Sequence, residues 1–110
     1  MIKVGIVGVG HLGEIHLKLI LKSNLYTLIG FFDSEKDRSE NISNKYNVKS
    51  YESYKDLCKD IDAVIICTPT LFHHEIAKFF LNNLKHVFIE KPITTNIDQA
   101  NELVTIKNKH

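Results

Sequence analysis

Three glycines follow the first apolar stretch of the chain at the spacing GxGxxG, as Gly8, Gly10 and Gly13 in the segment VGIVGVGHLGEIH. Each position suits a residue without a side chain for its own reason. The first permits a tight turn, the second lets a pyrophosphate approach the main chain, and the third lets a helix pack closely on a strand. A helix that begins here also offers unpaired N–H groups and the positive end of its dipole to phosphates. The spacing therefore predicts a dinucleotide-binding loop.

The residues between these glycines, Val9, His11 and Leu12, belong to the same predicted cofactor site because they lie on the loop itself. His11 could touch the ligand or point outward, and its position alone leaves both readings open. The alternative for the whole loop is a tight strand-to-helix turn that holds no ligand. An acidic residue at the right distance along the chain favours the ligand-binding interpretation.

That residue is Asp33, twenty positions after Gly13 and at the end of the second predicted strand. A carboxylate there would accept hydrogen bonds from the adenosine ribose hydroxyls and repel a 2′-phosphate, so we expect NAD rather than NADP. Ser34 is included in the predicted cofactor site and is expected to begin the next helix. The alternative for Asp33 is an ordinary helix cap, since aspartate is a good N-cap residue.

Composition excludes several other functions. A formal charge of +1, with acidic and basic residues interspersed, provides no basic stripe for nucleic acid. The sequence has no apolar run long enough to cross a bilayer and no leader pattern before the first strand, so we expect a cytoplasmic protein. Cys58 and Cys67 lack the spacing of a zinc site, and adjacent helical residues such as His73 and His74 point about 100° apart. No metal site is therefore predicted.

Short apolar runs alternate with longer amphipathic ones, which is typical of parallel strands joined by crossover helices. The predicted strands are 3–7, 27–32, a weak one at 48–51, 63–67 and 86–89. The predicted helices follow Gly10 and Asp33 and then cover 54–59, 71–81 and 96–107. We therefore expect one α/β domain over residues 1–110, a Rossmann-type doubly wound parallel sheet of about five strands in three αβα layers, with strand order 3-2-1-4-5.

Two further stretches, CTPTLFHHEIA and HVFIEKP, follow the later strands at the sheet edge where ligands bind. Together with the glycine loop and Asp33 they resemble the Gfo/Idh/MocA family of oxidoreductases, and the motif EKP is the most specific mark. The resemblance implies that cofactor contacts come from two stretches, Thr68, Pro69, Thr70 and His73 in the first and Glu90 and Lys91 in the second.

Lys91 is the predicted catalytic residue. The resemblance implies that it lies beside the nicotinamide and holds the reacting hydroxyl of the substrate. An ammonium group next to an oxygen that gains negative charge is also favourable on electrostatic grounds alone. The alternative is a solvated lysine at a strand end, but its place between Glu90 and Pro92 favours a functional role.

Leu84 stands where the family often has glycine, so we expect Asn82 or Asn83 to take any left-handed residue that ends the preceding helix, unless the turn differs. Family members also carry a second, α+β domain that supplies the residue exchanging the substrate's proton. Residues 1–110 lack that domain in this prediction. We therefore expect them to bind the cofactor without turning over substrate, and to self-associate through apolar surface left uncovered.

Three functions are compatible with these motifs. The first is the cofactor half of an NAD-dependent oxidoreductase that transfers hydride to or from a hydroxyl-bearing carbon of a sugar, polyol or cyclitol. The substrate itself would bind only with the missing domain. The second is a nucleotide-binding or sensor module without catalysis. The third is a different Rossmann enzyme, which the EKP motif argues against.

Overall fold

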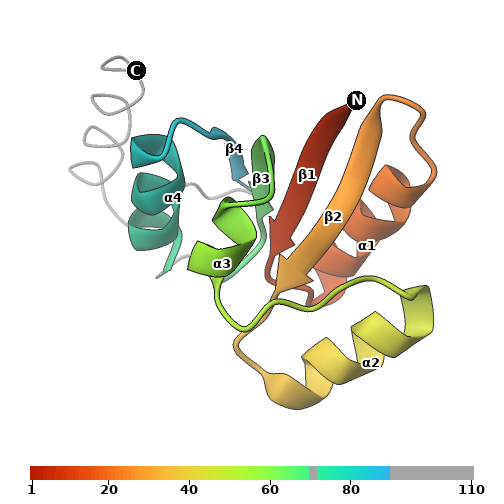
Figure 1. Ribbon diagram of the computed structural model, residues 1–110. Coiled ribbons are helices and arrows are strands. Elements are labelled where there is room, and N and C mark those ends of the chain that lie inside the picture. Colours follow the sequence, from red (N-terminus) through yellow and green to blue (C-terminus); the bar gives the residue numbers. More distant parts are fainter. Residues whose placement is uncertain (70–71, 90–110) are drawn as a thin grey trace.

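The computed structural model describes residues 1–69 and 72–89, in which strands and helices alternate along the chain (Figure 1). The strands are β1 (Ile2–Val7), β2 (Tyr26–Phe32), β3 (Ala63–Ile66) and β4 (His86–Ile89). The helices are α1 (His11–Leu21), α2 (Lys36–Tyr46), α3 (Tyr54–Cys58) and α4 (His73–Asn82). The predicted helix 96–107 lies outside the described residues. Of the helices described, none has the length and apolar character needed to cross a membrane.

The described strands form one parallel sheet in the order β2-β1-β3-β4. The predicted strand at 48–51 is reduced to a single bridge between Ser50 and Phe31, at the outer edge of β2. There the N–H of Phe31 donates to the carbonyl of Lys49 at 3.0 Å, and the N–H of Tyr51 donates to the carbonyl of Phe31 at 2.8 Å. The predicted strand order is thus confirmed, with its third member too short to count as a strand.

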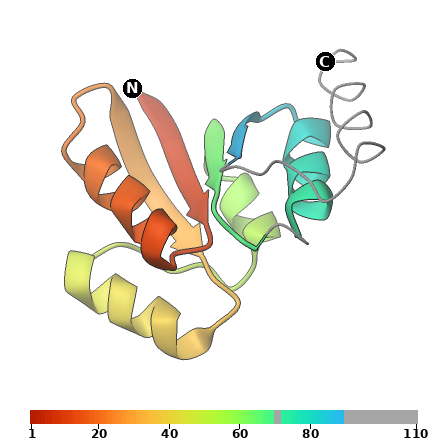
Figure 2. The same ribbon diagram turned by 180° about the vertical axis from the view of Figure 1, so that it is seen from behind.

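Helices cover both faces of the sheet, which makes the three αβα layers of the predicted fold (Figures 1 and 2). On the face covered by α1 and α2, buried side chains of the strands pack against Leu17 and Ile42. On the opposite face, α3 and α4 contribute Leu57 and Phe80 to a second buried cluster. Because both faces are covered, the central strands are apolar on both sides, which explains why their sequences do not alternate.

Parallel strands bring their carboxyl ends to the same edge of the sheet. At this edge, β1 leads into the glycine loop, β2 into Asp33 and β3 into Cys67 (Figure 1). Backbone hydrogen bonds hold these ends together: the N–H of Gly8 donates to the carbonyl of Phe32, and that of Cys67 to the carbonyl of Val7, both at 2.8 Å. The fold thereby gathers three loops that are far apart in the sequence.

The prediction that Ser34 begins the second helix is wrong. Helix α2 begins at Lys36, and Glu35 occupies the N-cap position without a side-chain cap. The reason is that the carboxylate of Asp33 accepts a hydrogen bond from the N–H of Glu35 at 2.8 Å, forming a turn that delays the helix by two residues. Ser34 lies exposed on that turn.

The left-handed residue after α4 is Leu84, with φ 62°, and neither Asn82 nor Asn83 takes that conformation. The N–H of Lys85 donates to the carbonyl of Phe80, and the N–H of Leu84 donates to the carbonyl of Leu81, each at 3.0 Å. These two bonds form the Schellman helix end, whose geometry places the left-handed residue at Leu84. The expectation that an asparagine would take this position is therefore wrong.

Candidate functional site

The three glycines of the loop have different surroundings. Gly8 has φ +93°, and a Cβ added there would lie 2.8 Å from the carbonyl carbon of Cys67. A Cβ added to Gly13 would lie 1.8 Å from the carbonyl oxygen of Gly8, so α1 packs directly on the loop. A Cβ added to Gly10 would meet nothing within 4 Å. The turn and packing roles expected of Gly8 and Gly13 are therefore visible, and Gly10 faces open space.

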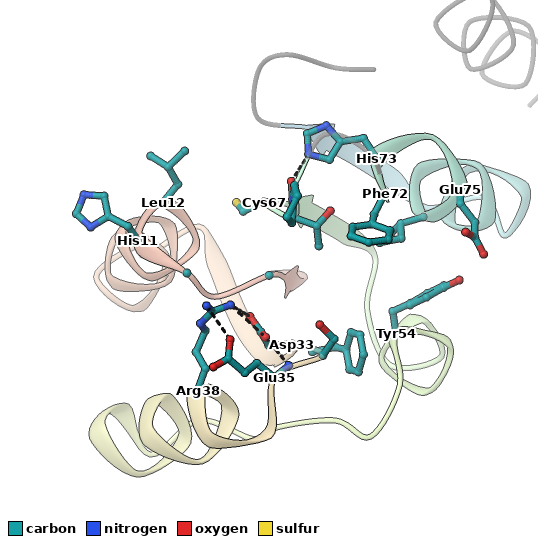
Figure 3. A pocket seen from close by; sticks show the side chains of 17 residues that line it. His11, Leu12, Asp33, Glu35, Arg38, Tyr54, Cys67, Phe72, His73 and Glu75 are labelled. Atoms are coloured by element: carbon teal, nitrogen blue, oxygen red, sulfur yellow. Dashed lines mark hydrogen bonds and ion pairs between the residues drawn. The ribbon is translucent and has the colours of Figure 1, made fainter. Parts of the chain in front are cut away.

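Helix α1 begins at His11, directly after Gly10, which serves as its N-cap without a side-chain hydrogen bond. The first N–H groups of a helix have no partner within it, so this end of α1 carries partial positive charge toward the open space. Val9 is buried at 1% exposure, whereas His11 and Leu12 are exposed. Figure 3 shows His11 and Leu12 directed away from Asp33. The backbone at Gly10 and at the start of α1 therefore borders the open space next to Gly10, and the side chains of His11 and Leu12 do not point toward Asp33.

Asp33 connects the end of β2 to the glycine loop. Its carboxylate Oδ2 accepts a hydrogen bond from the N–H of Val9 at 2.9 Å, and Oδ1 accepts the bond from Glu35 described above. Only 4% of the side chain is exposed. The two motifs that the sequence places twenty residues apart therefore meet in one hydrogen-bonded unit. The helix-cap alternative for Asp33 does not hold, because Glu35 occupies the N-cap position of α2.

Arg38 is a site residue that the sequence interpretation missed. Its guanidinium Nη1 lies 3.3 Å from Asp33 Oδ2 and 3.4 Å from Oδ1, while Nη2 lies 3.0 Å from Oε2 of Glu35 (Figure 3). Glu35 and Arg38 are three residues apart in sequence, a spacing that brings them to one side of the first turn of α2. An arginine three residues after a glutamate, close behind a strand-end aspartate, is the sequence pattern that could have predicted this contact.

The opposite side of the site is formed by the segment after β3 and the start of α4. His73 is buried at 2% exposure, and its Nε2 donates to the carbonyl of Thr68 at 2.5 Å, since a carbonyl only accepts (Figure 3). Thr68 Oγ1 is a buried hydroxyl with no hydrogen-bond partner among the described residues. Within residues 1–69 and 72–89, this side therefore has a buried hydroxyl that makes no hydrogen bond.

Between the two sides lies a cleft of about 800 Å³ (Figure 3). The predicted cofactor residues that line it are Gly8, Gly10, His11, Leu12, Asp33, Ser34, Thr68, Pro69 and His73. Val9 and Gly13 are buried behind the loop. Thr70, Glu90 and Lys91 lie outside the described residues. The fold thus brings most of the predicted set together.

The cleft has a second group of residues that the motifs did not indicate, among them Tyr54, Phe72 and Glu75. Burial, and then the charge of Glu75, raises the pKa of the Tyr54 phenol, so this group stays protonated at neutral pH. Phe72 is exposed to the extent of 54%. These side chains extend the cleft beyond Asp33 with apolar and aromatic surface.

This arrangement fits a nicotinamide dinucleotide. The open space over Gly10 admits a phosphate against the main chain, and the buried Thr68 hydroxyl has a hydrogen bond to offer. The volume of the cleft lies within the usual range for small-molecule sites. Within residues 1–69 and 72–89, no three His, Cys, Asp or Glu side chains are grouped so that they could hold a metal ion.

The family comparison agrees with the geometry. The model of the GFO_IDH_MocA family, described as an oxidoreductase family with an NAD-binding Rossmann fold, matches residues 2–110. The chain belongs to the Gfo/Idh/MocA family. Membership confirms the fold class and the resemblance inferred from the motifs.

Several Gfo/Idh/MocA relatives act on sugars or inositols according to their names. The chain is 31% identical to UDP-N-acetylglucosamine 3-dehydrogenase of Acidithiobacillus ferrooxidans over 102 residues, which cover 93% of this chain and 32% of that protein. It is 32% identical to myo-inositol 2-dehydrogenase of Thermotoga maritima over 108 residues, covering 93% of this chain and 31% of that protein. The similarity covers most of this chain and about a third of each relative.

Solved structures give the same result. The structure of the Acidithiobacillus ferrooxidans enzyme superposes with a TM-score of 0.90 at 30% identity, covering 98% of this chain and 35% of that one. Apo scyllo-inositol dehydrogenase from Lactobacillus casei superposes with a TM-score of 0.91 at 33% identity, covering 100% of this chain and 34% of that one. The chain thus spans about a third of the length of these relatives.

Proposed function

We propose that this Gfo/Idh/MocA domain binds NAD for an oxidoreductase that transfers hydride to or from a hydroxyl-bearing carbon of a sugar, polyol or cyclitol. The sugar and inositol dehydrogenases among the relatives support the substrate class. The observation that carries the binding role is the open space over Gly10 beside the bond between Asp33 and Val9. The space over Gly10 is the proposed phosphate site, Asp33 is the proposed ribose site, and the bond to Val9 places the two next to each other.

In this proposal the diphosphate lies against the main chain at Gly10 and the first turn of α1. The N–H groups of His11 and Leu12 donate to its oxygens, and the helix dipole adds to the attraction. A side chain at position 10 would occupy the same space. No basic side chain is required, because the main chain supplies the donors.

The adenosine ribose lies at Asp33, whose carboxylate accepts hydrogen bonds from the ribose hydroxyls. Ser34, exposed on the adjoining turn, lies next to this group. A buried carboxylate at this position disfavours a 2′-phosphate, which supports NAD over NADP. On the other side, Thr68 Oγ1 gains a partner when the cofactor is bound. Pro69 and His73 line the cleft on this side, and His73 holds the backbone of Thr68 through its hydrogen bond. We assign Thr70 to the same cofactor-binding loop.

The nicotinamide ring, when bound, accepts or supplies the hydride. We assign Glu90 to the nicotinamide side and Lys91 to the substrate, where its ammonium group would hold the reacting hydroxyl oxygen. These two residues are assigned from the motif EKP. A complete reaction also needs a group that exchanges the hydroxyl proton, and we place that group outside residues 1–110. The protein consisting of these residues alone is then expected to show cofactor binding and no dehydrogenase activity.

Calorimetric titration with NAD tests the binding role, using wild-type protein and Gly10→Ala. Because the added Cβ meets no protein atom and Gly10 has φ −67°, the melting temperature should stay unchanged. Affinity for NAD should fall about tenfold or more, because the methyl group takes the space of the diphosphate.

The matched control is Asn24→Ala, which removes a neutral exposed side chain outside the cleft. It should change neither the melting temperature nor the affinity. Equal NAD affinity for Gly10→Ala and wild type would reject the phosphate position. Failure of wild type to bind NAD or NADP at all would reject the proposed function.

A further inference from the structure

Thr68 lies where β3 has ended and the loop to α4 begins. Its amide side is held by the sheet, because the N–H of Cys67 donates to the carbonyl of Val7 at 2.8 Å. A Cβ added to Gly8 would lie 2.9 Å from the Thr68 nitrogen, so this backbone also packs against the glycine loop. The Thr68 carbonyl lies past Ile66, the last residue of β3 that pairs with a neighbouring strand. The sheet therefore fixes one end of Thr68 and leaves its carbonyl to another partner.

That partner is His73, the first residue of α4. Its Nε2 donates to the Thr68 carbonyl at 2.5 Å (Figure 3). The N-cap residue of α4, Phe72, makes no side-chain cap hydrogen bond. The imidazole thus joins the start of α4 directly to the end of β3. Because His73 is only 2% exposed, it has almost no surface that a ligand could touch.

The residue that follows Thr68 makes this bond important for the orientation of Thr68. Pro69 has no N–H to donate, and it restricts the residue before it to extended backbone conformations. Within that range, the rotation of the peptide group between the two residues sets where the Thr68 Cα–Cβ bond points. The carbonyl belongs to that peptide group, so the bond from His73 holds it. The same bond therefore fixes the direction of the Thr68 side chain.

We propose that His73 is a positioning residue for the cofactor, which acts through the hydroxyl of Thr68 and does not touch NAD itself. This inference rests on the proposed function, in which Thr68 Oγ1 hydrogen-bonds the bound cofactor. Thr68 lines the cleft, and its hydroxyl is buried without a partner among the described residues. Without the bond from His73 the peptide group can rotate, and Oγ1 then leaves the position from which it can reach the cofactor.

A double-mutant cycle of NAD affinity, measured by calorimetric titration, tests this assignment. His73→Phe keeps a buried aromatic ring and removes the donor, so NAD affinity should fall about threefold to tenfold, and no further than in Thr68→Val. In the Thr68→Val background the same substitution should change NAD affinity by less than about twofold, because the hydroxyl through which it acts is gone. A purely structural role would lower affinity equally in both backgrounds.

His73→Gln is the conservative variant, because its amide offers an N–H donor in place of the imidazole Nε2. It should bind NAD within about twofold of wild type. An affinity as low as that of His73→Phe would contradict the role of the donor.

His74→Phe is the matched control. It makes the same substitution at the next residue of α4, which is not part of the cleft lining. It should leave NAD affinity within about twofold of wild type.

Melting curves identify the variants that are folded at the titration temperature. His73→Phe should melt below wild type, because the Thr68 carbonyl loses the donor from His73. If His73→Phe does not fold, His73→Asn takes its place in the cycle. Its shorter amide does not reach the carbonyl, so the same pair of outcomes is expected.

Three results would overturn the role of His73 while leaving the proposed function intact. One is wild-type NAD affinity in folded His73→Phe protein. Another is an equal loss of affinity with and without the Thr68 hydroxyl. The third is a loss for His74→Phe as large as that for His73→Phe. Failure of wild-type protein to bind NAD or NADP is a different result, because it rejects the dinucleotide function itself.

Discussion

The two sides of the cleft hold their polar groups in opposite ways. On the side of β1 and β2, the carboxylate of Asp33 is filled by backbone and guanidinium donors, and Gly13 packs against the carbonyl of Gly8. On the side of β3 and α4, the hydroxyl of Thr68 is buried without a partner among the described residues. On the first side the polar groups of Asp33 are all hydrogen-bonded within the protein, which we call the closed network. On the second side the Thr68 hydroxyl is available to hydrogen-bond a ligand, as far as the described residues show.

The two sides should therefore respond differently to substitution. A closed network is part of the fold, so changes there cost stability as well as binding. An unused buried hydroxyl costs stability in the free protein and gains a partner only with ligand. Substitutions that break this network should therefore lower both stability and NAD affinity. Substitutions at Gly10, which has open space around it, and at Thr68 should lower NAD affinity without lowering stability.

The largest expected effect follows Gly13→Ala on the first side. The added Cβ would overlap the carbonyl oxygen of Gly8 at 1.8 Å, so α1 must move away from the loop. We expect the free energy of unfolding to fall by about 3 kcal/mol or more, measured by urea denaturation. Stability equal to that of wild type would show that the loop and helix are not packed as described.

Asp33→Ala should have the next largest effect. It leaves the N–H of Val9 and that of Glu35 without their acceptor, which should lower the free energy of unfolding by about 1–3 kcal/mol. NAD affinity should fall about tenfold or more, because the ribose acceptor is lost. Parallel titration with NADP should show a smaller loss. Equal affinities of wild-type protein for NAD and NADP would contradict the preference assigned to Asp33.

Thr68→Val separates stability from binding on the second side. Valine has nearly the same shape and removes a hydroxyl that has no partner in the part of the chain that the structure describes, so the melting temperature of the free protein should stay equal or rise. NAD affinity should fall about threefold to tenfold, because the cofactor loses one hydrogen bond. Thr68→Ser keeps the hydroxyl and should bind close to wild type. A fall in stability without a change in affinity would assign the hydroxyl to the fold.

The smallest effect concerns a surface contact between α1 and α2 that supports the first side. Glu14 Oε2 accepts from Lys45 at 2.8 Å and from the hydroxyl of Tyr46, and these bonds, that from Lys45 first, lower the pKa of Glu14. A lowered folded-state pKa contributes stability above the unfolded-state pKa, which is lost as the pH falls through the folded-state value.

Urea denaturation of wild type and Glu14→Gln over a pH series measures this contribution. The variant should be slightly less stable near neutral pH, and the difference should disappear in acid, where Glu14 is protonated in both states. A difference that grows on acidification would contradict the sign. Lys18→Gln, which changes a nearby charge without these hydrogen bonds, serves as the comparison.

Much of the closed side could be predicted from the sequence, because glycine spacing and a strand-end aspartate each encode a local requirement. The turn at Gly8 and the packing at Gly13 follow from the absence of a Cβ. The contact between Arg38 and Asp33 could not be predicted because it depends on the residue at which α2 begins. That start was set by the bond between the Asp33 carboxylate and the N–H of Glu35, a competition that helix propensity does not reveal.

Tertiary context also decided two features elsewhere. The pattern of segment 48–51 predicts a strand, but the segment forms only one bridge with β2, between Ser50 and Phe31. Lys49 and Ser50 are exposed there, at the outer edge of the sheet. Leu84 takes the left-handed conformation because the hydrogen bonds that end α4 place it there, although leucine disfavours it. Residue preference predicted an asparagine, and the position of the helix end overrode that preference.

The proposed function requires the main chain at Gly10 to receive the diphosphate of NAD. Amide NMR spectra of ¹⁵N-labelled protein titrated with NAD report on this contact residue by residue. If the diphosphate binds there, the largest shifts should fall on the amides of residues 9–13, followed by those of residues 33–35. Saturation with NAD that leaves the amides of residues 9–13 unchanged, with the largest shifts elsewhere in the chain, would contradict it.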